Sequence, residues 1–151
     1  MGVVGIFSFS NFEIMKIKTD NIFQVIEIES PAETVYKALT NPELLTVLTG
    51  MSAEMSSHEG GTFHAWNNRS HGYIMRLIPG KRIVQAWRHD AFEDGMYSTV
   101  IIDIESTDVG SRVSFNHIGV PESESGWLTE TWKKDFWNPL SEHLESKLTH
   151  S

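Results

Sequence analysis

Six short runs with strand-like character follow one another between Met51 and Gly119, and this series constrains the fold more than any other feature of the chain. Each gap between the runs holds Gly, Pro, Asn or Asp, the residues that tight turns need. Strands spaced so closely predict an antiparallel meander. The predicted strands are Ala53–Ser57, Thr62–Trp66, His71–Ile78, Arg82–Arg88, Tyr97–Ser106 and Arg112–Ile118.

The segment before this meander predicts one further strand and two short helices. Residues Ile22–Ile28 are rich in β-branched and aromatic side chains, as is typical of a strand. The following S-P-A-E, at Ser30–Glu33, predicts a helix with the serine as N-cap, the proline at the first helical position and the glutamate closing a capping box. A second short helix is expected to begin at Asn41-Pro42 and to end at Gly50.

The C-terminal part predicts one long helix over Glu122–Leu148, because strand character has stopped and no glycine follows Gly126. Apolar residues four apart give this helix a stripe that would face the sheet, with Trp127 and Trp137 beside it. Asn138-Pro139 interrupts the helix, and a proline there removes one backbone hydrogen bond and predicts a kink. The stripe consists of Leu128, Trp132, Phe136, Leu140, Leu144 and Leu148.

The order of these elements predicts an α+β fold with two layers, in which the long helix covers one face of a curved antiparallel sheet of about six or seven strands. A chain of 151 residues has the length of one domain. We expect an N-terminal extension over residues 1–20 and a single domain over residues 21–149. The extension is apolar from Val3 to Phe12, but it has no basic residues before that stretch and no A-x-A-like cleavage site, so secretion is not expected.

The charge of the chain argues against a polyanionic partner. Twenty acidic residues stand against 12 basic ones, which gives a net charge of −8, whereas nucleic acids and anionic membranes attract a positive face. No apolar run approaches the roughly 20 residues that span a bilayer. The absence of cysteine excludes disulfides and thiolate chemistry and fits a cytoplasmic location.

Neither a metal site nor catalytic machinery is predicted. Among the seven histidines, His64 and His71 on neighbouring predicted strands form the best pair, but a structural metal site usually needs four ligands and a catalytic one three. The H-E-x-x-H and G-x-S-x-G signatures are both absent. We therefore expect a non-enzymatic protein with no cofactor. His117, if it faces an interior cavity, is the one feature that favours an enzyme.

Two polar residues fall on the predicted inner face of the sheet. Gln85 alternates with Ile83 and Trp87 on one strand, and His117 follows Val113 and Phe115 on the last. A buried polar group needs a hydrogen bond. Either the two side chains are satisfied by the protein or by water, or they line a cavity and offer contacts to a small ligand.

Four sequence segments together are similar to a known family. They are S-P-A-E-T-V-Y-K-A-L-T-N-P-E-L-L (Ser30–Leu45), G-G-T-F-H (Gly60–His64), G-Y-I-M-R-L-I-P-G-K-R-I-V-Q-A-W-R (Gly72–Arg88), and G-V-P followed by G-W (Gly119–Trp127). In this order and spacing, over about four-fifths of the chain, they resemble the activator of heat-shock protein 90 ATPase homologue family of the START-like (SRPBCC) superfamily.

The resemblance implies a helix-grip fold, a curved antiparallel sheet wrapped around the long C-terminal helix, with an apolar cavity between the two. Many members of the superfamily bind hydrophobic small molecules there. On this basis the expected function is binding of a small apolar or lipid-like ligand, and the alternative is a chaperone-interacting module in the stress response. The candidate ligand-binding residues are Phe63, Met75, Gln85, Trp87, Phe115, His117, Trp127, Trp132 and Phe136.

Overall fold

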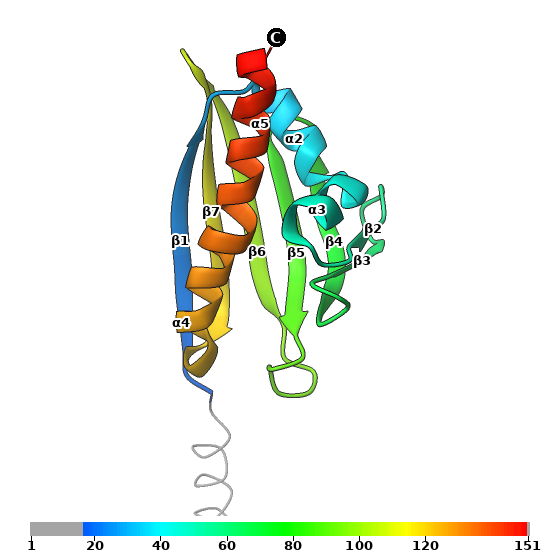
Figure 1. Ribbon diagram of the computed structural model, residues 1–151. Coiled ribbons are helices and arrows are strands. Elements are labelled where there is room, and N and C mark those ends of the chain that lie inside the picture. The colour runs from blue at the N-terminus through cyan, green and yellow to red at the C-terminus, as the bar shows by residue number, and fades with distance from the viewer. Residues whose placement is uncertain (1–16, 151) are drawn as a thin grey trace, which may run out of the picture.

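The computed structural model describes residues 17–150, with side chains described as far as residue 146. The apolar stretch of the predicted extension, Val3–Phe12, lies outside the described residues, and so does the side chain of Leu148. The elements, labelled in Figure 1, are β1 (Thr19–Ile28), α2 (Ala32–Leu39), α3 (Pro42–Thr49), β2 (Glu54–Met55), β3 (Thr62–Ala65), β4 (Ser70–Ile78), β5 (Arg82–His89), β6 (Ser98–Thr107), β7 (Gly110–Pro121), α4 (Glu122–Thr131), the π-helical segment η1 (Trp132–Trp137) and α5 (Asn138–His150).

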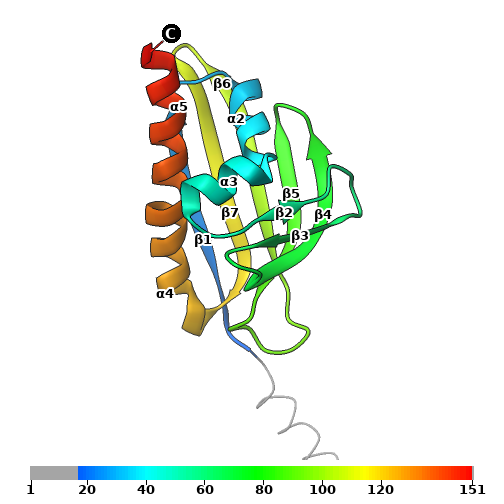
Figure 2. The ribbon, with the colours of Figure 1, turned by 45° about the vertical axis from the view of Figure 1, so that its right-hand side comes forward.

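All seven strands form one antiparallel sheet in the order β1-β7-β6-β5-β4-β3-β2. The meander predicted from the turn residues is therefore confirmed, and the first strand closes it by pairing with the last. Figure 2 shows the sheet curving around the long C-terminal helix, with α2 and α3 on the same side. The predicted strand at Ala53–Ser57 is reduced to two residues, whereas the last strand continues as far as Pro121.

The start of the first helix differs from the prediction. Pro31 stands at the N-cap and the helix begins at Ala32, with no side-chain capping bond, so the predicted capping box of Ser30 is wrong. Ser30 is instead buried, and its carbonyl oxygen accepts a hydrogen bond from the Ser111 hydroxyl. This bond connects the loop after β1 to β7.

The second helix has the predicted ends. The side chain of Asn41 accepts a hydrogen bond of 3.1 Å from the backbone N–H of Leu44, as expected of an N-cap. Gly50 has φ 73° and ends the helix in the left-handed conformation, which glycine adopts without a steric penalty.

The long helix contains a wide turn just before Pro139. Residues Trp132–Trp137 are π-helical, and the N–H of Asn138 donates to the carbonyl of Lys133, five residues back. Figure 1 shows the helix continuing through this segment without a break, and the irregularity that the structure contains is this wide turn before the proline. The wide turn places Trp137 on the inner face five residues after Trp132, and its side chain is only 1% exposed.

The hydrophobic core lies between the inner face of the sheet and this helix. Val100, Val113 and Phe115 of the sheet are fully buried against Leu128 and Leu140 of the helix. Among the helices described, none is both long enough and apolar enough to cross a membrane.

Candidate functional site

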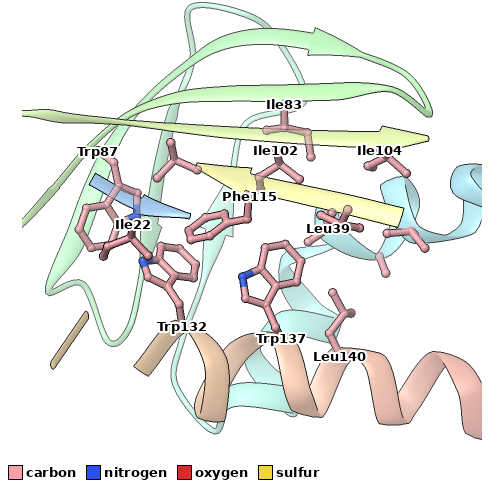
Figure 3. Close-up of a cluster of buried hydrophobic side chains, with 14 of the residues drawn as sticks. Ile22, Leu39, Ile83, Trp87, Ile102, Ile104, Phe115, Trp132, Trp137 and Leu140 are labelled. Atoms are coloured by element: carbon pink, nitrogen blue, oxygen red, sulfur yellow. The ribbon is translucent and has the colours of Figure 1, made fainter. Parts of the chain in front are cut away.

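The space between sheet and helix is filled by aromatic side chains, among them four of the five tryptophans, Trp66, Trp87, Trp132 and Trp137. Figure 3 shows Trp132 and Trp137 projecting from the helix toward Trp87 and Phe115 on the sheet side. Trp132 stands at the centre, with ring centroids 5.0 Å from Trp66, 5.7 Å from Trp87 and 4.7 Å from Phe115. The pair with Trp66 is edge-to-face and the other two are tilted, and aromatic pairs at such distances are favourable beyond the area they bury. The region where a ligand was expected is thus largely occupied by the protein itself.

His117 connects the helix to the sheet by a chain of hydrogen bonds. Its Nδ1 accepts from the indole N–H of Trp132 at 3.0 Å, and its Nε2 lies 2.7 Å from the hydroxyl of Ser98. That hydroxyl in turn donates to the backbone carbonyl of Trp87 at 2.8 Å. Because an indole nitrogen only donates, Nδ1 must be the accepting nitrogen, so the proton of the neutral imidazole sits on Nε2 and is donated to Ser98.

Burial in the core keeps the imidazole of His117 neutral. Burial lowers the pKa of the imidazole from 6.5 to about 3. Both ring nitrogens already have partners, so the side chain has no free polar atom to offer to a ligand or to act as a base. For His117, the structure contains the satisfied core hydrogen bond, one of the two alternatives left open by the sequence, whereas Gln85 lines a cavity.

A narrow cavity remains beside Trp132. It measures about 60 Å³, whereas pockets for drug-sized ligands have roughly 300 to 1,000 Å³. Its lining includes Leu39 of α2, Met55 of β2 and Phe136 of the long helix. Larger hollows of about 400 to 560 Å³ occur elsewhere, but they are open to solvent on the surface.

Seven of the nine candidate residues meet in this interior. The other two do not: Trp127, which is 37% exposed, lies at the border of the interior, and Met75, which is 56% exposed, lies away from it. The placement predicted for Met75 is wrong because Ile74 takes the inward position and a bulge between Ile74 and Arg76 leaves Met75 on the outer face. The seven are Phe63, Gln85, Trp87, Phe115, His117, Trp132 and Phe136.

Trp127 covers His89 at the edge of the aromatic cluster. The two rings are 4.9 Å apart in an edge-to-face arrangement, and the indole N–H donates to the carboxylate of Glu124 at 2.7 Å. Burial lowers the pKa of His89, whose Nδ1 accepts from the backbone N–H of Ala91. The indole of Trp127 is therefore held by protein groups.

Sequence reasoning missed Trp66, which packs on both Trp87 and Trp132. Strand alternation places it on the face opposite Phe63. The structure reverses it, because Trp66, Asn67 and Asn68 have φ of 52°, 59° and 68° and turn the chain back over the core. Two consecutive asparagines, which tolerate this conformation, were the available signal.

These features define a START-like, helix-grip protein: a curved seven-stranded antiparallel sheet, two short helices after the first strand, and a long C-terminal helix in the grip of the sheet. The chain belongs to the family described as "Activator of Hsp90 ATPase homolog 1-like protein", whose model matches residues 29–146.

Curated relatives share this segment at low identity. The human activator of 90 kDa heat shock protein ATPase homolog 1 is 23% identical over 128 residues, which are 85% of this chain and 38% of the relative. The Dictyostelium discoideum activator is 26% identical over 111 residues, 72% of this chain and 29% of the relative. The chain thus spans less than two-fifths of the length of these relatives.

Solved structures support the fold. An Hsp90 activator from Plasmodium falciparum has a TM-score of 0.75 at 21% identity, with 83% of this chain and 96% of the other covered. The Aha1 dimer from Colwellia psychrerythraea has a TM-score of 0.73 at 22% identity, with the same coverage. Identities this low establish the shared fold alone.

Proposed function

We propose that this protein is a non-enzymatic, co-chaperone-like module of the cytoplasm that contacts a chaperone of the heat-shock protein 90 class through its surface. The observation that carries the proposal is the filled interior: the cavity beneath the helix is about 60 Å³ in a family whose named members activate that chaperone's ATPase. A protein with so little free interior volume offers its surface for recognition. The division into an extension, residues 1–20, and one domain, residues 21–149, belongs to the same proposal.

The outer face of the sheet offers an apolar surface for this contact. Six exposed apolar residues, here called the outer band, lie on the strands or the loop beside them: Phe23, Val25, Tyr73, Met75, Tyr97 and Ile118. One row of paired positions runs from Tyr73 through Ala86 and Thr99 to Ile118. The solvent face of a two-layer sheet is usually polar, so the exposed apolar side chains of the outer band indicate a contact surface.

The size of the outer band fits a transient contact. Its residues are 40% to 63% exposed, and since large side chains bury roughly 150–250 Å² each, together they present on the order of 500 Å². A stable interface buries about 800 Å² on each partner. The outer band therefore supplies the apolar centre of an interface that neighbouring polar residues complete.

The test is ATP turnover by the chaperone of the same organism in the presence of the purified full chain. We expect the protein to change the rate, and the variant Phe23→Ser/Tyr73→Ser to lose most of that change because it lacks two of the largest apolar side chains of the outer band. Val47→Ser is the matched control, since Val47 is 78% exposed on α3, away from the outer band. An unchanged rate at saturating wild-type protein would exclude the proposed function.

A small ligand remains the second candidate because of one buried group. The indole N–H of Trp137 has no hydrogen-bond partner among the described residues, and an unpaired buried donor costs about 1–3 kcal/mol. A ligand with an acceptor atom would satisfy it after a rearrangement of the neighbouring rings.

A further inference from the structure

A row of metal-binding side chain types crosses the edge of the sheet outside the core. Glu54 on β2 is paired with His64 on β3, and His64 is paired with His71 on β4 (Figure 2 shows the three strands side by side). Directly paired positions place their side chains on the same face of a sheet, with Cβ atoms about 5 Å apart. Together with Asn68, these three residues are the whole lining of a surface hollow of about 420 Å³.

The two imidazoles are at a separation that suits one shared ion. Their ring centroids are 6.1 Å apart and their planes are inclined by 31°. Since a zinc–nitrogen bond is about 2.0–2.1 Å long, two rings that share an ion have centroids roughly 5 to 6.4 Å apart. Within the described part of the chain neither ring makes a hydrogen bond, so ligation would not break an existing one.

One positive charge, that of Arg88, lies on the neighbouring strand. Arg88 is paired with His71 on the other side, but its guanidinium donates to the carbonyl oxygens of Glu93 at 2.9 Å and Met96 at 3.3 Å and is engaged there. The Glu54 carboxylate adds negative charge beside His64. The net charge of −8 favours cations over the molecule as a whole.

We propose that His64 and His71 form a surface site for a single divalent transition-metal ion, with Glu54 as the adjoining carboxylate. The described residues contain no group of three His, Asp or Glu side chains already placed to hold a metal. The two imidazoles are therefore the direct ligands, and water fills the remaining positions. Imidazole selects Cu²⁺, Ni²⁺ and Zn²⁺ over Mg²⁺ and Ca²⁺, which require oxygen ligands.

Such an ion would connect β3 to β4 beside the short strand at the end of the sheet. β2 consists of two residues and pairs with β3 alone. An ion bound to the folded protein and not to the unfolded chain stabilises the fold by mass action. Occupation of the site would therefore stiffen the β3–β4 hairpin beside the contact of α3 with β2.

The experiment is calorimetric titration of the chelator-treated full chain with Zn²⁺ and Cu²⁺, together with thermal melting. We expect one saturable site per chain and a rise in Tm. His64→Ala and His71→Ala should each weaken binding at least tenfold and remove the rise in Tm. His64 is exposed and His71 is half-buried outside the core, so the metal-free variants should have nearly the Tm of the wild type, and circular dichroism verifies their fold.

His58→Ala is the matched control, because His58 is an exposed histidine in the β2–β3 loop outside the paired row. It should leave affinity unchanged, Mg²⁺ should not bind, and Glu54→Gln should weaken binding by a smaller factor. Electron paramagnetic resonance of the Cu²⁺ complex should show two nitrogen ligands. Absence of saturable binding, or equal affinity of the His64, His71 and His58 variants, would overturn the proposal.

Discussion

The indole N–H of Trp132 donates to Nδ1 of His117 across 3.0 Å, and through this bond the long helix is fixed to the last strand inside an otherwise apolar core. Both residues are at most 4% exposed. His117 is also hydrogen-bonded to Ser98 on β6, whose hydroxyl donates to the backbone of β5. One series of hydrogen bonds therefore connects the helix to three strands.

Removal of either hydrogen-bond partner of His117 should lower the free energy of unfolding. Trp132→Phe leaves Nδ1 of His117 without a donor, and Ser98→Ala leaves Nε2 without an acceptor. Each unpaired nitrogen should cost about 1–3 kcal/mol. Trp132→Phe also loses the volume of the indole. The destabilisation of the double variant should differ from the sum of the two, because both residues bond the same imidazole. Denaturant unfolding gives the free energy of unfolding of the wild type, the two single variants and the double variant.

The control for lost volume is Trp66→Phe, since the Trp66 indole makes no hydrogen bond among the described residues. Strict additivity of Trp132→Phe and Ser98→Ala would contradict a connected chain through His117.

Acid should destabilise the protein through His117. The unfolded chain binds a proton at the ordinary histidine pKa of 6.5, whereas the folded chain holds the pKa near 3. The stabilisation is complete above pH 6.5 and is lost as the pH falls toward 3, by at most about 1.4 kcal/mol per pH unit.

The measurement is the free energy of unfolding from pH 7 to pH 4, with His117→Gln as comparison. The variant lacks the titrating group and should show a shallower loss. His89 and the carboxylates contribute equally to the pH dependence of both proteins. If the free energy of unfolding fell equally steeply with pH in both, His117 would be protonated or exposed in the folded protein.

Apolar ligands should leave the protein unaffected if its interior stays filled. With a cavity of about 60 Å³, we expect a library of lipids, flavonoids and aromatic compounds to change neither tryptophan fluorescence nor Tm. A saturable quench with a matching rise in Tm would favour the ligand carrier instead. Trp137→Phe would then identify the unpaired indole N–H as the polar contact if it weakened that binding.

Two glycines should respond to alanine in opposite directions. A Cβ on Gly72 would stand 1.8 Å from the carbonyl oxygen of Ala86 on the adjacent strand, so Gly72→Ala should separate β4 from β5 and lower Tm by many degrees. Gly126 lies in α4 with no atom within 4 Å of a Cβ, and Gly126→Ala should stabilise by about 0.5–1 kcal/mol. Thermal melting of both variants checks the pair, and equal effects would contradict the close approach of the strands.

Most of the fold could be predicted from the sequence because its signals are local. Turn residues delimit the strands, alternation identifies the inner face, and Asn41 and Gly50 mark the ends of α3. The family resemblance added the grip of the sheet around the helix. What failed was the amount of free space inside, since packing density depends on how large side chains from distant segments interdigitate.

Three local deviations account for the errors in the candidate site. A bulge turned Met75 outward, a left-handed run turned Trp66 inward, and the π-helical segment brought Trp137 into the core. Each shifts the face of a side chain by one residue, which a regular period of two or 3.6 cannot anticipate. The tertiary contacts that stabilise these deviations come from elsewhere in the chain.

The π-helical segment has a consequence for comparing this chain with its relatives. A π turn holds one more residue than an α turn at the same position in a helix. A relative whose helix is regular there should therefore align with a one-residue gap between Trp132 and Trp137 while superposing on both sides of it. In such an alignment the gap marks the change from an α-helical to a π-helical turn. Trp132 and Trp137 then correspond to positions four residues apart in the relative.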